Sequence, residues 1–219
     1  MRKALLSMLI LGCGGTKMPV MVTTGGADIP AEVGRTYRWS FDDAQPGPLP
    51  ADFVNILGDW QVVPDGNAPS GPNVLRQTRK YDDPNFPRFA VKDLTFANLT
   101  VRARCRPESG DDDQACGLLF RLQDHDNYYV TRANALEDNV RLYHVVGGER
   151  AELASADLKV ERGKWHSLEA TARGDQLTVS WDGRQVLSAR DGRFAKGKIG
   201  LWTKADSVTA FDDFEAIAE

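Results

Sequence analysis

The sequence lacks the residue patterns that support zinc or nucleotide chemistry. It contains only three histidines, and His125, His144 and His166 are scattered without the spacing of zinc ligands. It has no serine-centred nucleophile elbow, no Walker loop and no dinucleotide fingerprint. These absences argue against a zinc enzyme, a serine hydrolase of that type and a nucleotide-binding protein.

Excess positive charge is also missing. The chain has 27 Lys and Arg against 31 Asp and Glu, a formal net charge of −4 at pH 7. Removal of residues 1–12 takes away Arg2 and Lys3 and moves this charge to −6. A nucleic-acid partner requires a basic face that displaces counterions, so we expect no nucleic acid to bind.

No apolar run is long enough to span a bilayer, which takes about 20 residues in a helix. The short run Ala4 to Leu11 follows two basic residues and is typical of a secretory signal. Ile10-Leu11-Gly12-Cys13 resembles the lipobox of bacterial lipoproteins, which implies a signal peptide over 1–12 and a lipidated Cys13. The alternative is a plain signal peptide with an incidental cysteine. With Gly14 in place of an aspartate, the resemblance implies export to the bacterial cell envelope, at its outer membrane, with membrane contact through Cys13 only.

Only two cysteines remain once Cys13 is lipidated. Cys105 and Cys116 lie in predicted strands on either side of the polar loop 106–115, so they could face each other across a hairpin. In an oxidising compartment we expect them to form a disulfide, and two buried thiols are the alternative.

We find no amphipathic helix. Residues 13–36 are rich in glycine and proline and predict a flexible tether, so the domain is expected to span 37–219. Short alternating runs follow, separated by turn residues, and Gly147-Gly148, Gly174-Asp175 and Asp182-Gly183 predict tight hairpins. Some thirteen strands predict an all-β, two-sheet antiparallel jelly-roll sandwich. They are 60–63, 74–78, 88–91, 94–104, 117–123, 128–134, 140–146, 150–154, 165–172, 177–181, 185–189, 198–203 and 208–217.

A series of short motifs resembles the concanavalin A-like lectin/glucanase superfamily, nearest its laminin-G-like and 3-keto-disaccharide hydrolase domain branch. The motifs are Phe41-Asp42-Asp43, Gly58-Asp59-Trp60, Gly117 to Arg121, Asp126 to Tyr129, Asn139 to Tyr143, Trp165-His166, Trp181-Asp182-Gly183, Gly200 to Thr203 and Phe211 to Phe214. The resemblance implies two curved antiparallel sheets whose concave face often receives sugars. The Asn-Ser-Gly-Ile-like stretch of the keto-sugar hydrolases is replaced here by Ala115 to Leu118, and the alternating Glu/Asp strand of the glucanases is absent. The resemblance therefore implies the fold more strongly than an activity.

Carboxylates cluster in several places. Glu108 with 111–113, 124–126 and Glu137-Asp138 fall in predicted loops, where solvated turn residues are expected. Asp212 and Asp213 instead lie inside the last predicted strand and need partners if buried. A structural calcium ion is one solution, with Asp42 or Asp43 on its other side, and hydrogen bonds or arginine pairs are the alternative.

Strand alternation predicts a candidate sugar-binding surface. If the apolar series of each strand fills the core, then Arg121, Arg141, Tyr143 and Trp202 lie on the outer face of one sheet, and Tyr129 joins them. Arginines beside aromatic rings suit a sugar, whose apolar ring face stacks while its hydroxyls bind polar groups. Ordinary cross-strand pairs are the alternative.

The leading hypothesis is therefore an envelope lipoprotein with a carbohydrate-binding, lectin-like sandwich whose partner is a glycan or polysaccharide. A glycoside or 3-keto-glycoside hydrolase of the same superfamily is the first alternative. A structural or protein-interaction module without a sugar site is the second.

Overall fold

The computed structural model describes residues 28–219, which form strands and loops and contain no helix. Within these residues, therefore, no helix is long and apolar enough to cross a membrane. The expected signal peptide over 1–12, the expected lipidation site Cys13 and residues 14–27 of the expected tether lie outside the described residues.

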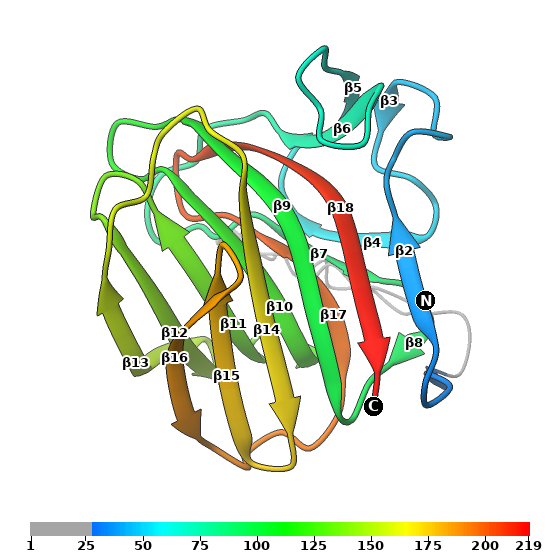
Figure 1. Ribbon diagram of the computed structural model, residues 1–219, viewed down its shortest axis with the longest axis vertical. Coiled ribbons are helices and arrows are strands. Elements are labelled where there is room, and N and C mark those ends of the chain that lie inside the picture. The colour runs from blue at the N-terminus through cyan, green and yellow to red at the C-terminus, as the bar shows by residue number, and fades with distance from the viewer. Residues whose placement is uncertain (1–27) are drawn as a thin grey trace, which may run out of the picture.

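Eighteen strands make up the domain (Figure 1). They are β1 Ile29–Pro30, β2 Thr36–Trp39, β3 Gly47–Pro48, β4 Phe53–Leu57, β5 Trp60–Pro64, β6 Asn73–Gln77, β7 Arg88–Val91, β8 Leu94–Thr95, β9 Leu99–Ser109, β10 Ala115–Asp124, β11 Asn127–Asn134, β12 Asn139–Val146, β13 Glu149–Asp157, β14 His166–Arg173, β15 Gln176–Trp181, β16 Arg184–Arg190, β17 Lys198–Trp202 and β18 Val208–Ala218.

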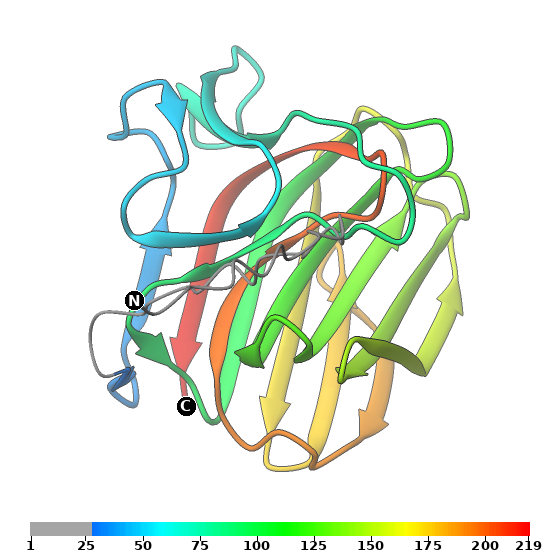
Figure 2. The same cartoon turned by 180° about the vertical axis from the view of Figure 1, so that it is seen from behind.

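Two large sheets pack face to face. The seven-stranded sheet has the order β13-β12-β11-β10-β17-β7-β4, and the nine-stranded sheet has the order β16-β15-β14-β9-β18-β6-β5-β3, with β2 also paired to β18. The nine-stranded sheet is nearer the viewer in Figure 1 and the seven-stranded sheet in Figure 2. All pairings within these two sheets are antiparallel. The structure is thus the two-sheet jelly-roll sandwich that the sequence predicts.

The main core lies between the sheets because the strands alternate in burial. Along β9, Leu99, Val101 and Ala103 are buried, whereas Arg102 between them is exposed. Aromatic rings join the two sheets: the ring of Trp60 on β5 meets that of Phe89 on β7 edge to face at 4.9 Å. Period-two burial therefore holds across the domain, as expected for a sandwich.

Tight turns fix the hairpins at the expected places. Gly147 and Gly148 join β12 to β13, and both have positive φ, at 57° and 83°. Asp182 and Gly183 join β15 to β16 with φ of 49° and 78°. This left-handed backbone gives two-residue hairpins the twist of their strands, and glycine adopts it at little cost.

The folded domain begins earlier than the expected boundary at residue 37. Ile29 and Pro30 form β1 and pair in parallel with Leu94 and Thr95 of β8. Ala31 packs against the core, so at least residues 29–36 belong to the domain rather than to a tether. The sequence does not reveal this because β1 is only two residues long and contains proline.

A disulfide joins Cys105 and Cys116, with their Cα atoms 6.2 Å apart. From the sequence we expect the two cysteines to face each other across a hairpin. The structure shows a different arrangement. Cys105 lies on β9 of the nine-stranded sheet and Cys116 on β10 of the seven-stranded sheet, and both are buried in the core. The bond therefore connects the two sheets across the core.

Candidate functional site

The seven-stranded sheet is buried on both of its faces. Its inner face belongs to the main core, and its outer face carries a second apolar cluster that includes Tyr128, Tyr143 and Trp202. Phe86, from the loop between β6 and β7, packs against this cluster. An antiparallel sheet that faces water usually alternates apolar and polar residues, so this buried outer cluster is a departure from that pattern.

Arginines and aromatic rings alternate on this outer face. The rings of Phe86 and Trp202 are stacked, with centroids 5.4 Å apart. The Arg150 guanidinium lies 4.8 Å from the centroids of both Phe86 and Tyr143. The Arg88 guanidinium lies 5.4 Å from the ring centre of Tyr128. Below, these six residues are called the Arg/aromatic face, and each guanidinium–ring contact is within cation–π range.

Strand register explains why these residues meet. Trp202 on β17 stands opposite Gly117 of β10 on one side and Arg88 of β7 on the other. A Cβ atom at Gly117 would lie 2.9 Å from Trp202 Cε3, so the glycine makes room for the indole ring. Arg150 is placed beside Tyr143 because the β12–β13 hairpin pairs it with Val145.

Several buried hydrogen-bond donors on this face have no acceptor. Arg88 Nε and Arg150 Nη1 are buried and have no hydrogen-bond partner among residues 28–219, and the same holds for Nε of neighbouring Arg132. A buried donor left unpaired costs about 1–3 kcal/mol. Burial also raises the pKa of Tyr128 above its ordinary value, which keeps the phenol protonated beside Trp202. These nitrogens are themselves buried, so the guanidinium groups of Arg88 and Arg150 are held against the rings mainly by their cation–π contacts.

A hollow of about 280 Å³ opens at one end of the Arg/aromatic face. Phe86, Arg88 and Tyr128 line it, together with His125 and Asp126 from the turn between β10 and β11. Its size is close to the lower end of small-molecule sites. The hollow gives a ligand access to aromatic rings and to an arginine in one place.

Acidic and basic side chains meet beyond Tyr143, in a group here called the acidic rim: Asp113, Arg132, Glu137 and Lys204. Arg132 Nη2 lies 2.7 Å from Glu137 Oε2 and 3.3 Å from the Tyr143 hydroxyl. Lys204 Nζ lies 2.8 Å from Asp113 Oδ1 and 3.4 Å from Glu137 Oε1. One ammonium group thus holds both carboxylates, whose nearest oxygens are at most about 6 Å apart.

The two carboxylates of the acidic rim have pKa values shifted in opposite directions. Burial alone would raise the pKa of Glu137, but Arg132, Asn139 and Lys204 outweigh it and lower the value to about 2. Burial raises the pKa of Asp113 above its ordinary value, although Lys204 opposes the shift. The two neighbouring carboxylates thus differ in their surroundings, with burial dominating at Asp113 and the cationic partners dominating at Glu137. From the sequence we expect Asp113 to be a solvated loop residue, but the structure buries it.

Arg121 does not belong to the Arg/aromatic face, which corrects the sequence-based expectation. The β10 ladder is interrupted between Phe120 and Asp124, and Arg121 itself has a φ of +49°. This bulge reverses the alternation, so Leu122 joins the outer cluster while Arg121 is turned away from it. Arg121 is 1% exposed, and its guanidinium donates to backbone carbonyls instead.

Tyr129 is also on the opposite side from the expected one. It follows the outward-facing Tyr128 directly, so alternation turns it into the main core, where its ring stacks on Phe120 at 5.3 Å. Its hydroxyl donates to Asp191 at 2.6 Å, and burial raises its pKa to about 12. Of the five expected residues, the structure brings together Arg141, Tyr143 and Trp202 on one face, as their cross-strand positions show. Arg141 forms ion pairs with two glutamates, Glu137 and Glu152.

The four carboxylates expected around a calcium ion do not converge. Asp212 is fully buried and accepts hydrogen bonds from the backbone N–H and hydroxyl of Ser70, and this hydroxyl also lies 3.2 Å from Asp42. Asp213 lines a hollow on the outer side of the nine-stranded sheet. No group of three or more His, Cys, Asp or Glu in residues 28–219 is arranged to hold a metal ion. Asp212 is thus held by hydrogen bonds from Ser70, and the calcium ion stays a prediction.

Comparison with solved structures decides the fold. The carbohydrate-binding module CBM66 from Bacillus subtilis superposes with a TM-score of 0.64 at 19% identity, covering 75% of this chain and 94% of the module. A β-glucanase from Bacillus licheniformis superposes with a TM-score of 0.57 at 10% identity, covering 86% of this chain and all of the enzyme. The chain has a concanavalin A-like fold. No family model matches the chain.

Among curated proteins, this concanavalin A-like chain is similar to the levanase of Bacillus subtilis (strain 168). The two are 25% identical over 114 residues, which is 52% of this chain and 17% of the levanase. The chain therefore spans only about a sixth of that enzyme.

Sequence reasoning missed Phe86, Arg88, Tyr128, Arg132 and Arg150. Two of them could have been predicted. Tyr128 and Arg132 are four residues apart in a strand that the sequence predicts, so their side chains lie on the same face of the sheet. Arg88 and Phe86 could not have been predicted. They belong to β7 and to the loop before it, and β7 comes to this sheet by pairing with β17, which lies more than a hundred residues later in the chain.

Proposed function

We propose that the outer face of the seven-stranded sheet binds a glycan. The observation that carries this proposal is the hollow of about 280 Å³ in which Arg88 lies beside the aromatic rings of Phe86 and Tyr128. A sugar suits both the arginine and the rings, because its hydroxyl oxygens accept hydrogen bonds while its ring carbons pack on an aromatic face. The carbohydrate-binding and glucan-cleaving proteins that share the fold support the proposal.

Arg150 provides the test. It makes no ion pair with any of residues 28–219, so Arg150→Gln is expected to cost only its two cation–π contacts, about 0.5–1 kcal/mol each, and to leave the domain folded. We expect the variant to bind its polysaccharide at least about tenfold more weakly, a loss of about 1.4 kcal/mol. Binding is measured on a panel of neutral and acidic polysaccharides that includes levan.

The matched control is Arg184→Gln, an exposed arginine on β16 of the other sheet. It should bind as the unaltered chain does. Equal binding by the Arg150→Gln and Arg184→Gln variants would rule out the Arg/aromatic face as the glycan site.

A second candidate function is hydrolysis of a glycosidic bond, as in a glycoside or 3-keto-glycoside hydrolase. The proximity of the Asp113 and Glu137 carboxylates, which both contact Lys204, favours it, because glycoside hydrolysis commonly uses a pair of carboxyl groups. Their separation of at most about 6 Å is compatible with such a pair. In this role Asp113 would be the acid and Glu137 the charged partner.

Product analysis tests this second function. If the chain cleaves a polysaccharide of the panel, Asp113→Asn should slow product release by at least about 100-fold, the usual contribution of a general acid. Asp112→Asn is the control, because Asp112 is the exposed neighbour of the buried Asp113. Cleavage at an unchanged rate by the Asp113→Asn variant would exclude the acidic rim as an active site.

We also propose that Cys13 is lipidated and anchors the chain to the bacterial cell envelope. The support is the Ile10-Leu11-Gly12-Cys13 motif after a short basic and apolar leader. We expect Cys13→Ser to move the protein from the membrane fraction to the soluble fraction on cell fractionation. A Cys13→Ser variant that stays in the membrane fraction would contradict the anchor.

A further inference from the structure

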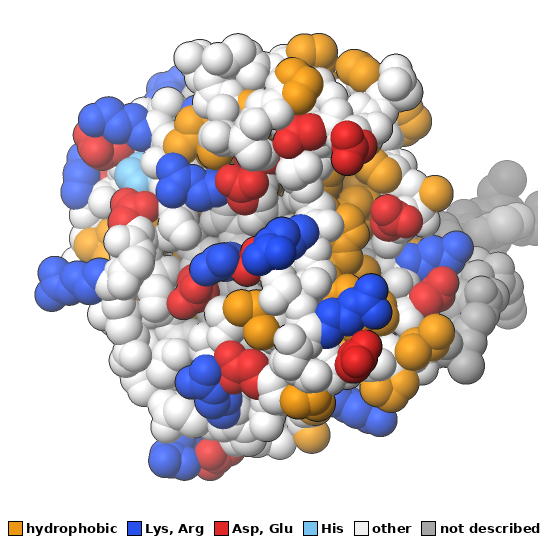
Figure 3. All heavy atoms as spheres, turned by 45° about the vertical axis from the view of Figure 1, so that its right-hand side comes forward, with side chains coloured by type: hydrophobic (Ala, Val, Ile, Leu, Met, Phe, Trp, Pro, Cys, Tyr) orange, Lys and Arg blue, Asp and Glu red, His pale blue; other side chains and the backbone are white. Residues whose placement is uncertain are grey.

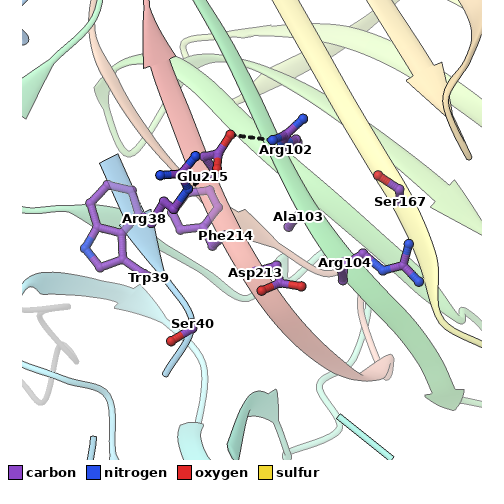
Figure 4. Close-up of a pocket in the computed structure, with 10 residues that line it drawn as sticks. All are labelled: Arg38, Trp39, Ser40, Arg102, Ala103, Arg104, Ser167, Asp213, Phe214 and Glu215. Carbon is purple, nitrogen blue, oxygen red and sulfur yellow. Dashed lines mark hydrogen bonds and ion pairs between the residues drawn. The ribbon is translucent and has the colours of Figure 1, made fainter. Parts of the chain in front are cut away.

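A second hollow, of about 320 Å³, opens on the outer face of the nine-stranded sheet (Figure 4). It lies where β18 exchanges one partner strand for another. Thr209 to Phe211 pair with β6, and Phe214 to Ile217 pair with β2, which leaves a gap beside Asp212 and Asp213. Asp213 has a φ of +48°, and the register with β9 shifts between Asp212 and Glu215. The gap is thus created by a bulge in the last strand.

The three arginines of this hollow differ in their carboxylate partners. Arg38 and Arg102 both contact the one carboxylate of Glu215, at 2.5 Å and 2.6 Å. Arg104 makes no ion pair among residues 28–219, and its buried Nε has no hydrogen-bond partner among them. Three arginines and two carboxylates, the second being Asp213, line the hollow, and Arg102 also lies 4.0 Å from the carboxylate of Glu169. Elsewhere on this side of the molecule, acidic and basic side chains intermingle (Figure 3).

The remaining groups suit a polyhydroxylated ligand. Ser40 and Ser167 bring hydroxyl groups to the lining, and Asp213 brings hydrogen-bond acceptors. Trp39 and Phe214 close the hollow toward the core, where their rings are stacked 5.1 Å apart. Figure 4 shows these side chains coming from β2, β9, β14 and β18, so the hollow is assembled from strands distant in sequence.

We propose that this hollow binds an acidic sugar, the ionised residue of a uronic acid. Its carboxylate pairs with the Arg104 guanidinium, a charge-assisted contact that Arg104 does not make within the described domain. Its hydroxyls bind Asp213 and Ser167, which lie on β18 and β14, the two strands that flank β9. This site lies on the opposite sheet from the Arg/aromatic face, with the main core between them, and does not rest on the function proposed above.

Titration of the purified full-length chain with D-glucuronate, D-glucose and acetate tests the proposal. We expect glucuronate to bind at least tenfold more tightly than glucose or acetate. Arg104→Gln should lower the affinity for glucuronate at least tenfold, whereas Arg184→Gln should leave it unchanged. Ser167→Tyr keeps the charge and fills the hollow, so it should abolish binding even if Arg104→Gln proves unstable.

Each of the following results would overturn the site. Glucuronate binding no tighter than glucose binding would remove the role of Arg104, and acetate binding as tightly as glucuronate would remove the sugar. Loss of glucuronate binding in Arg150→Gln, with Arg104→Gln unaffected, would place the acidic sugar on the Arg/aromatic face instead.

Discussion

Arg121→Ala is expected to bring the domain close to unfolding. The Arg121 side chain is 1% exposed and donates to three backbone carbonyls: Nε to Ala97 at 2.9 Å, and Nη1 to Gly174 at 2.8 Å and Phe194 at 3.0 Å. These carbonyls belong to three separate connections, between β8 and β9, β14 and β15, and β16 and β17. A single guanidinium therefore ties together three loops at one end of the sandwich.

The expected cost of Arg121→Ala is about 4 kcal/mol or more. Each carbonyl left buried without a donor costs about 1–3 kcal/mol, and the lost side chain leaves a cavity as well. Domains commonly have a total stability of about 5–15 kcal/mol, so this loss is a large fraction of the whole. Chemical denaturation monitored by tryptophan fluorescence measures it.

Two further variants separate the causes. Arg121→Met keeps most of the volume and removes only the donors, so it should recover the part of the loss that comes from the cavity. Arg184→Ala, at an exposed arginine, should change stability by less than about 0.5 kcal/mol. If Arg121→Ala were as stable as the unaltered chain yet failed to bind glycans, the sequence-based assignment of Arg121 to a sugar site would be restored.

Glu137→Gln is the second variant with a large expected effect. Glu137 is the carboxylate that neutralises Arg132, whose side chain is 1% exposed and whose Nε already has no partner among the described residues. Removal of the charge leaves a buried guanidinium without its countercharge, which typically costs about 3–5 kcal/mol. Because Gln keeps the shape and one oxygen, we expect a loss near 3 kcal/mol at pH 7.

The pH dependence of stability identifies the cause. The pKa of Glu137 is lowered from 4.5 to about 2 in the folded state, so its contribution is complete above about pH 4.5 and is lost as the pH falls toward 2. The unaltered chain should therefore lose stability across this window, and Glu137→Gln should lose less. Glu149→Gln, at an exposed position on β13, is the control and should follow the unaltered chain. Parallel stability curves for the Glu137→Gln variant and the unaltered chain across pH 2–5 would show that Glu137 is not the group responsible.

Glu137→Gln is also expected to weaken glycan binding, because Glu137 holds Arg132 in place beside Tyr143. Arg132 Nη2 lies 3.3 Å from the Tyr143 hydroxyl, so the orientation of Arg132 fixes one edge of the Arg/aromatic face. A less restrained Arg132 should weaken glycan binding even under conditions where the domain is fully folded.

Much of the fold was predictable from the sequence because its signals are local. Alternation along Leu99 to Arg104 places apolar side chains on one side of β9 without reference to any other strand. Glycine pairs such as Gly147-Gly148 allow the left-handed backbone of a tight turn wherever they occur. Strand positions, hairpins and the all-β class follow from such patterns, and so did the paired orientation of Tyr143 and Trp202.

The sites required the tertiary structure, because they depend on contacts between residues far apart in the chain. The bulge at Arg121 reverses the alternation of β10, and it occurs where the pairing of β10 with β11 and β17 is interrupted. The gap lined by Asp213 exists because β18 pairs with β6 along one part and with β2 along another. Period-two alternation tells which residues of a strand share a side, whereas register and bulges decide what that side faces. Those features are set by the packing of the whole sandwich.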